Sequence, residues 1–361
     1  MTALFESGTI GSLQLPNRLI RSATAEYMSD LDGKPEQPLA DLYRELARGG
    51  IGLIITGHAF VHEGGRCNLH MTGIHGDDLI PAMEMLTIAV HDEEGRVVVQ
   101  INHGGRQCPA EAIPGPAVAP SPVALSKDSE RPQELNEEGI REIISAFGDA
   151  AGRAKAAGFD GVQIHAAHGY LINQFNSSAA NWRPDRWGST PAGRMRFLEE
   201  VASSVRDRVG EEYPVLIKLG MEDYVRDGLT LKDSADIVRH LSDWGIDGLE
   251  ISGGIGRTSV RKDILRPEDE GYFLDGARMA REATDLPIIL VGGMRSKRVM
   301  EAILQEGSAD FISMSRPLIR EPDLPRRLRE GQNRASCISC NRCWPPPGEY
   351  GIACRDPNRK G

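Results

Sequence analysis

The chain has 361 residues, of which 40% are hydrophobic and 26% charged, and these fractions exclude global disorder. The formal net charge of −10 argues against a nucleic-acid-binding protein, because such proteins neutralise phosphates with a basic surface. No run of 18 apolar residues is present, and the N-terminal residues lack the basic and apolar stretches of a signal peptide. We therefore expect a cytoplasmic protein that acts on a small molecule and contacts neither membrane nor nucleic acid.

Short apolar segments alternate with segments of helical periodicity along most of the chain. The apolar segments are rich in β-branched residues, as strands buried on both faces are, and we predict strands at 19–25, 51–57, 97–103, 161–165, 215–220, 248–252, 288–292 and 309–313. Helices are predicted at 38–48, 78–94, 136–157, 191–209, 230–244, 272–283, 296–306 and 321–330. Eight β-α units predict an α/β protein with a (β/α)8 TIM barrel over residues 1–335. The alternative is a doubly wound sheet, which usually shows a glycine-rich fingerprint after its first strand.

Two regions break this repeat. Residues 104–135 form a long insertion with six prolines after the third predicted strand, and a loop of that length is usually functional. In a barrel we expect it to lie over the active-site face. Residues 336–361 form a short, proline-rich tail that holds four of the six cysteines, and we treat it as a separate cysteine-rich extension.

Three hydrogen-bond donors lie at the end of the fourth predicted strand, namely His165, His168 and Tyr170. In a TIM barrel the chemistry lies at the carboxyl ends of the strands. Imidazoles polarise a carbonyl group or hold an anion, and a tyrosine can donate a proton. A single such residue would be explained by packing at the rim of the barrel, but three of them at one strand end favour a catalytic role.

Other strand ends carry groups suited to a planar, phosphorylated cofactor. Gln100 on the third strand offers an amide donor and acceptor to a heterocycle edge. Lys218 on the fifth strand needs an anionic partner, which is either the edge of a reduced flavin or Glu250 on the sixth strand. The last two strands lead into glycine- and arginine-containing loops, the usual phosphate-binding place of this fold; the residues are Gly292, Gly293, Ser315 and Arg316.

The tail cysteines follow the pattern C-x2-C-x2-C-x10-C, made by Cys337, Cys340, Cys343 and Cys354. Four closely spaced thiols favour one metal centre, and such runs are more typical of iron–sulfur clusters than of zinc. We rank a 4Fe-4S cluster first, zinc second and vacant cysteines third. Cys67 and Cys108 stand alone in the sequence, and we interpret both as ordinary thiols.

These motifs together resemble the old yellow enzyme family of FMN-dependent oxidoreductases over nearly the whole chain. The motifs that carry the resemblance are Pro16-Asn17-Arg18, Gln100 with His103-Gly104-Gly105-Arg106, the segment 158–175, Asn181-Trp182-Arg183-Pro184-Asp185-Arg186, Arg194 to Phe197, Gly292-Gly293 and Ser315-Arg316-Pro317. The tail is similar to that of 2,4-dienoyl-CoA reductase and trimethylamine dehydrogenase, in which a 4Fe-4S cluster lies beside FMN. Ala25 departs from the family pattern, which often has a cysteine or threonine there.

The resemblance implies a role for each of these residues. The isoalloxazine ring would be held by Ser22, Ala23, Thr24, Gly57, Gln100 and Lys218, and the phosphate by Gly292, Gly293, Ser315 and Arg316. His165, His168 and Tyr27 would bind the substrate. Tyr170 would protonate Cα of an α,β-unsaturated carbonyl compound while reduced flavin gives hydride to Cβ, with NAD(P)H as the reductant.

Two other functions remain open at this point. The chain is alternatively the FMN/4Fe-4S catalytic subunit of an electron-transfer complex, a dehydrogenase or demethylase whose electrons pass to or from another protein. A third hypothesis is a barrel without flavin, such as an aldolase that uses Lys218 as a Schiff base and has a zinc-binding tail. A homo-oligomer is compatible with each of the three.

Overall fold

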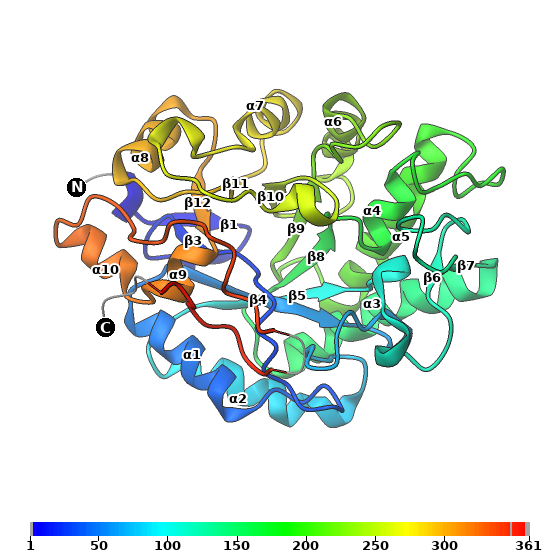
Figure 1. The fold of residues 1–361 in the computed structure, drawn as a ribbon, viewed down its shortest axis with the longest axis horizontal. Helices are drawn as coiled ribbons and strands as arrows, with labels where there is room; N and C mark the ends of the chain where they lie inside the picture. The colour runs from blue at the N-terminus through cyan, green and yellow to red at the C-terminus, as the bar shows by residue number, and fades with distance from the viewer. Residues whose placement is uncertain (1–2, 347–348, 358–361) are drawn as a thin grey trace.

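The predicted barrel is present. In the computed structural model, which describes residues 3–346 and 349–357, eight parallel strands close into a barrel in the order β10-β11-β12-β3-β4-β5-β8-β9 (Figure 1). The strands are β3 (Leu19–Arg21), β4 (Leu53–Phe60), β5 (Val97–Asn102), β8 (Val162–Ala166), β9 (Val215–Gly220), β10 (Gly248–Ser252), β11 (Ile288–Leu290) and β12 (Phe311–Met314). Every one of them overlaps a predicted strand. The chain therefore has the (β/α)8 architecture, and the doubly wound alternative is wrong.

Helices surround the barrel, one or more after each strand. They are α1 (Gln37–Arg48), α2 (Ile80–His91), α3 (Glu137–Ala156), α4 (Leu171–Asn176), α5 (Pro191–Val209), α6 (Leu231–His240), α7 (Leu274–Ala283), α8 (Lys297–Glu306), α9 (Arg316–Arg320) and α10 (Leu324–Arg329). Their starts follow ordinary capping rules. Thr230 and Asp233 form the predicted capping box of α6, and the Asn136 side chain accepts the Gly139 N–H at the start of α3.

A short antiparallel hairpin, β1 (Gly8–Ile10) and β2 (Leu13–Leu15), closes the amino-terminal end of the barrel. Its buried side chains pack in one cluster with inward-facing residues of six barrel strands, including Ile20, Leu216 and Phe311. This cluster fills the floor of the barrel, so the interior is open only at the carboxyl ends of the strands. Sequence analysis missed the hairpin because its strands have three residues each.

The insertion at 104–135 contacts the loop between α4 and α5, which follows β8. It contains the short parallel pair β6 (Val118–Ala119) and β7 (Gln133–Glu134). Arg183 fixes this pair from outside, because its Nη1 donates to the carbonyl oxygens of Pro120 at 3.0 Å and Leu135 at 2.6 Å. The insertion is therefore tied to a loop at the carboxyl end of the barrel, and its first turn reaches the central cavity through Gln107.

The tail runs back across the molecule from α10 and packs against the segment after β3 (Figure 1). The backbone N–H groups of Gly351 and Ile352 donate to the carbonyl oxygens of Tyr27 at 2.9 Å and Glu26 at 2.8 Å. The cysteine-rich segment is thus placed at the carboxyl-end face of the barrel, where the active site of this fold lies.

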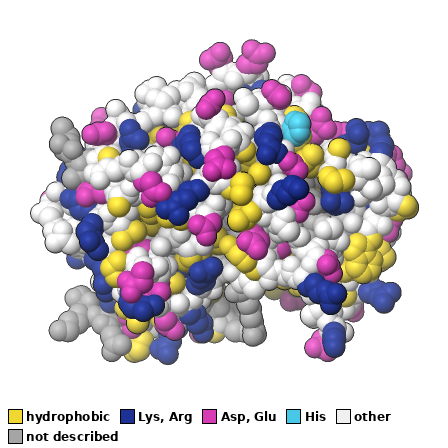
Figure 2. Space-filling view, turned by 90° about the horizontal axis from the view of Figure 1, so that it is seen from above, with side chains coloured by type: hydrophobic (Ala, Val, Ile, Leu, Met, Phe, Trp, Pro, Cys, Tyr) yellow, Lys and Arg dark blue, Asp and Glu magenta, His cyan; other side chains and the backbone are white. Residues whose placement is uncertain are grey.

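Acidic and basic side chains are interspersed over the face of the molecule shown in Figure 2. Among the described residues, none of the helices has both the length and the apolar character needed to cross a lipid bilayer.

Candidate active site

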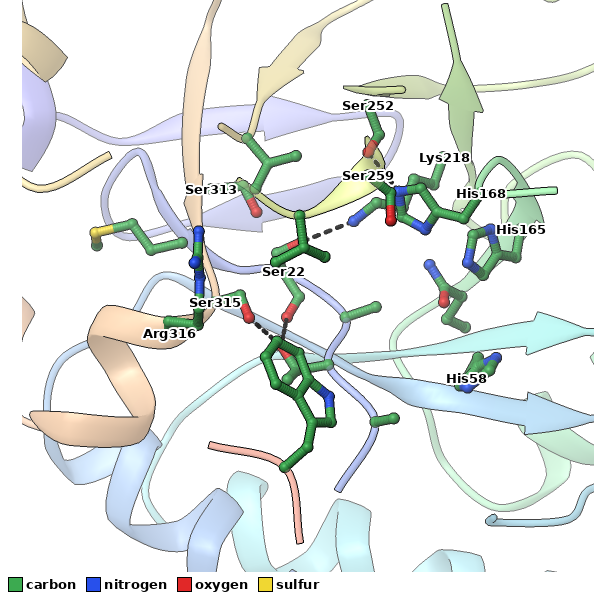
Figure 3. A pocket seen from close by; sticks show the side chains of 18 of the residues that line it. Ser22, His58, His165, His168, Lys218, Ser252, Ser259, Ser313, Ser315 and Arg316 are labelled. Atoms are coloured by element: carbon green, nitrogen blue, oxygen red, sulfur yellow. Dashed lines mark hydrogen bonds between the residues drawn. The ribbon is translucent and has the colours of Figure 1, made fainter. Parts of the chain in front are cut away.

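A cavity of about 450 Å³ opens at the carboxyl ends of the barrel strands. It lies within the range usual for small-molecule and cofactor sites. Twelve of the predicted site residues line it, namely Ser22, Ala23, Thr24, Tyr27, Gln100, His165, His168, Tyr170, Lys218, Gly293, Ser315 and Arg316. In Figure 3 the imidazoles of His165 and His168 lie at one end of the view and Arg316 at the other, with Ser22 between them.

Two of the residues predicted to bind the cofactor, Gly57 and Gly292, do not line the cavity. The Gly57 N–H donates to Glu26 Oε1 at 3.0 Å, and a Cβ on Gly57 would lie 1.9 Å from Glu26 Oε2. Gly292 has φ 145°, and its carbonyl oxygen accepts the Gly271 N–H at 2.7 Å. Gly57 thus makes room for the Glu26 side chain and bonds to it, and Gly292 bonds to the backbone of Gly271. Both glycines support the segments behind the cavity wall.

The imidazoles of His165 and His168 meet at one corner of the cavity, with ring centroids 5.1 Å apart. The Ala167 N–H donates to His165 Nδ1 at 3.3 Å, so the neutral ring carries its proton on Nε2. His168 Nε2 lies 2.7 Å from Ser252 Oγ. Burial lowers the pKa of His165 well below its usual value and that of His168 to about 3. Both rings are therefore uncharged at neutral pH, and the Nε2–H of His165 is free to act as a donor.

Tyr170 packs against this pair, its ring centroid 4.9 Å from that of His165. The turn that brings all three side chains together needs positive φ angles at His168 (62°) and Gly169 (77°). Two side chains hold this turn: Gln107 Nε2 donates to the His168 carbonyl at 2.8 Å, and Asn173 Oδ1 accepts the Gly169 N–H at 2.6 Å. Burial raises the pKa of Tyr170 well above its usual value, so its phenol is protonated and can donate.

A buried hydrogen-bond network crosses the bottom of the cavity. Lys218 Nζ donates to Ser22 Oγ at 2.7 Å and lies 3.2 Å from Glu250 Oε1. Glu250 also accepts from Ser313 Oγ at 2.9 Å and from Gln163 Nε2 at 2.9 Å. Glu250 is thus one of the two anionic partners that we expected for Lys218. Because Lys218 also lines the cavity, its ammonium group remains beside any ligand bound there.

Gln100 extends this network toward β8, since its Nε2 donates to Gln163 Oε1 at 2.7 Å. Gln163 is fully buried and connects Gln100 to Glu250. An amide held this way presents its remaining polar atoms in a fixed orientation, which suits recognition of a planar heterocycle edge.

The opposite end of the cavity lies at the start of α9. Thr24 Oγ1 donates to Ser315 Oγ at 2.8 Å, which joins the segment after β3 to the segment after β12. Arg316 is buried, and its Nη1 donates to the Arg261 carbonyl at 2.7 Å and to Asn341 Oδ1 in the tail. The guanidinium group therefore holds a barrel loop and the tail together beside the cavity.

The tail itself forms part of the cavity wall, through Ser339 and Trp344. Each of these residues is next to a cysteine of the C-x2-C-x2-C run. All four tail cysteines are free thiols. Burial and the other three cysteines raise the pKa of Cys343 to about 12. Within the described part of the chain, no three His, Cys, Asp or Glu side chains are grouped to hold a metal ion, and this finding applies to an iron–sulfur cluster as much as to zinc.

Sequence reasoning missed His58, which lines the cavity between Tyr170 and His165, with ring centroids 5.1 and 6.0 Å away. Asn102 Nδ2 lies 2.9 Å from His58 Nδ1, and burial lowers the pKa of His58 to about 4. We predicted that the second strand ends at Gly57, but an irregularity between Ile55 and His58 lets β4 continue to Phe60. The sequence signal that could have revealed this residue is the position of His58, a polar residue inside the apolar run 51–60.

Comparison with known proteins shows which family model, relatives and solved structures this chain resembles. The family model described as "NADH:flavin oxidoreductase / NADH oxidase family" matches residues 3–335. The NADPH dehydrogenase of Geobacillus thermodenitrificans is 35% identical over 325 residues, which are 90% of this chain and 93% of that protein. The old yellow enzyme homologue from Zymomonas mobilis superimposes with a TM-score of 0.79 at 28% identity, covering 93% of this chain and 95% of that one.

A longer relative matches over part of its length. The NADH oxidase of Thermoanaerobacter brockii is 36% identical over 344 residues, which are 94% of this chain and 52% of that protein. The chain thus spans about half the length of this relative.

Proposed function

Because the chain belongs to the NADH:flavin oxidoreductase / NADH oxidase family, we propose that it is an FMN-dependent reductase of activated C=C bonds that uses NAD(P)H. The observation that carries this proposal is the corner of the cavity where two uncharged imidazoles, His165 and His168, meet the protonated phenol of Tyr170. That corner shares one cavity with the polar network around Lys218.

The residues present fit FMN. Ser22, Ala23 and Thr24 bring a stretch of small side chains to the cavity wall, where backbone approaches a flat ligand closely. Gln100 and the Lys218 ammonium would hold the pyrimidine edge of the ring, and Gly293, Ser315 and Arg316 the phosphate at the other end. When bound, FMN supplies hydride transfer from NAD(P)H to the substrate.

The protein's own residues would bind and protonate the substrate. His165 and His168 donate hydrogen bonds to the carbonyl oxygen of an α,β-unsaturated compound, and Tyr27 borders the same space. These donors stabilise the negative charge that grows on that oxygen in the transition state, and burial strengthens them. Tyr170 Oη gives its proton to Cα, and the buried turn at 167–169 keeps the phenol in place.

The experiment that tests this proposal measures the two half-reactions of Tyr170→Phe by anaerobic stopped-flow. Reduction of the flavin by NADPH should stay within about twofold of the native rate. Reoxidation by an enone should slow by about 10²- to 10⁴-fold, the usual contribution of a positioned proton donor. An equal loss in both half-reactions would refute Tyr170 as the proton donor.

We infer a second candidate function from the tail, namely the FMN/4Fe-4S catalytic subunit of an electron-transfer complex. Supporting it are the other three tail cysteines, which are close enough to Cys343 to raise its pKa, and two tail residues, Ser339 and Trp344, in the wall of the proposed FMN cavity. Such a subunit would exchange electrons with a protein partner. Dependence of turnover on that partner, with no activity from NADPH alone, separates it from the first function.

A further inference from the structure

Cys67 and Cys108, which stand 41 positions apart in the sequence, come together at the edge of the cavity. Cys67 lies in the loop after β4, and Cys108 follows the short 3-10 helix Gly105–Gln107 in the insertion. Both are free thiols, and their sulfurs lie against the same glycine, Gly104. The two cysteines that stand alone in the sequence are therefore neighbours in the fold.

Gly104 makes the space that the two sulfurs share. A Cβ on Gly104 would lie 2.5 Å from Cys67 Sγ and 2.5 Å from Cys108 Sγ, which is closer than real Cβ atoms come to any neighbour. The backbone of Gly104 is ordinary, with φ −66° and ψ −24°, so its conformation does not require glycine. Glycine is needed at position 104 because any side chain there would collide with the two sulfurs.

The pair is connected to the proposed proton-donor site. Cys67 lines the cavity, and Asn102 Nδ2 lies 3.9 Å from Cys67 Sγ and 2.9 Å from His58 Nδ1. The His58 ring in turn packs against Tyr170. One amide side chain therefore contacts both the thiol pair and the imidazole beside Tyr170.

We propose that Cys67 and Cys108 are a redox-active pair, which a small hydroperoxide converts into a disulfide. Cys67 reacts first, because it borders the cavity while Cys108 is buried. Its thiolate attacks a peroxide oxygen, the O–O bond breaks, and a sulfenic acid forms with release of an alcohol, or of water from hydrogen peroxide. The sulfur of Cys108 then displaces water from the Cys67 sulfur. Two thiols are oxidised by two electrons in total, and one hydroperoxide is reduced.

The disulfide ties the loop after β4 to the start of the insertion, and both segments border the cavity through Cys67 and Gln107. In cells that keep thiols reduced, such bonds are usually transient and act in catalysis or sensing. We expect the closed pair to slow turnover. This consequence rests on the proposed function, whereas the thiol chemistry does not.

The full-length protein, freed of reductant and treated with hydrogen peroxide over hours, tests the proposal. A long time course suits this pair, because the hydrogen bond with Cys108 and burial raise the pKa of Cys67 well above its usual value. Digestion under non-reducing conditions and mass spectrometry should find the peptides of Cys67 and Cys108 joined, and dithiothreitol should separate them.

Two matched variants serve as controls. Cys108→Ser should give no cross-link, and dimedone should trap a sulfenic acid at Cys67. Cys340→Ser should still form the cross-link.

Either of two results would overturn the proposal: Cys67 oxidised to sulfinic or sulfonic acid without a cross-link, or Cys67 unreacted while the tail cysteines oxidise.

A second measurement follows the rate of enone turnover. We expect this rate to fall about tenfold in the cross-linked protein and to recover with dithiothreitol, while peroxide-treated Cys108→Ser keeps its rate. A cross-linked protein with unchanged turnover contradicts the expected slowing. Untreated protein without turnover contradicts the proposed ene-reductase function and leaves the cross-linking result as it stands.

Discussion

At the scale of single residues, the site depends on imidazoles that stay uncharged. His58, His165 and His168 are held in one cavity, and burial lowers the pKa of each. A protonated imidazole there would face Lys218, whose positive charge further lowers the pKa of both His165 and His168. Neutral N–H donors select an oxygen that gains charge only during the reaction, such as a carbonyl oxygen.

The same depressed pKa values make the fold sensitive to acid. Between about pH 4 and 6.5 the unfolded chain protonates His58 while the folded chain does not, so the free energy of unfolding falls as the pH falls. His58→Gln should flatten this slope by up to about 1.4 kcal/mol per pH unit over that range. Urea unfolding between pH 4.5 and 7, with the partly exposed His91→Gln as the control, measures it. Equal slopes for native protein and His58→Gln would show that residue 58 takes up its proton as readily in the folded state as in the unfolded state.

At the scale of elements, the cavity wall after β3 depends on tight packing between strands. Glu26 accepts from Arg21 at 2.7 Å, Tyr43 at 2.8 Å and the Gly57 N–H at 3.0 Å. Gly57 therefore has a supporting role at the base of β4, which differs from the direct contact with flavin implied by the family resemblance.

Gly57→Ala should lower the free energy of unfolding by about 1–3 kcal/mol, because its Cβ would meet Glu26 Oε2 at 1.9 Å and force the carboxylate to move. Gly152→Ala is the matched control. Gly152 lies inside α3, and its Cβ would meet nothing within 4 Å. We expect that control to raise stability by about 0.5–1 kcal/mol, as alanine does in a helix interior. Equal effects of the two changes in denaturant unfolding would contradict the packing argument.

At the scale of the whole molecule, the tail and the barrel build one site together. Arg316 donates to the tail through Asn341 and to a barrel loop through the Arg261 carbonyl. The cysteine-rich segment is therefore fixed beside the end of the cavity that we assign to phosphate. This position would let a metal centre in the tail exchange electrons with a bound flavin.

Cys340→Ser tests the cluster separately from the flavin. Cys340 does not line the cavity, whereas its neighbour Ser339 does. We expect the native protein to carry iron after anaerobic purification, and the variant to lose it and retain FMN. Iron and flavin are quantified on the same samples, with Cys67→Ser as the control that should keep both. Unchanged iron in Cys340→Ser would contradict the cluster assignment.

The sequence predicted the barrel well because strands buried on both faces are continuous apolar runs, and each of the eight was found. Most of the candidate site was also predictable, since barrel chemistry lies at strand ends and His165, His168 and Tyr170 lie at the end of one strand. Contacts between distant segments were not predictable in this way. The strand irregularity before His58, the Cys67–Cys108 pair and the tail residue Trp344 in the cavity wall each depend on tertiary packing.

The central claim is that one cavity reduces a C=C bond with electrons from NAD(P)H. The most direct measurement mixes the protein with FMN and one equivalent of NADPH without oxygen, then adds cyclohexenone and follows flavin absorbance. We predict bleaching by NADPH and full recovery on addition of the enone, with one equivalent of saturated ketone formed. Bleached flavin that stays reduced in the presence of the enone would contradict the account.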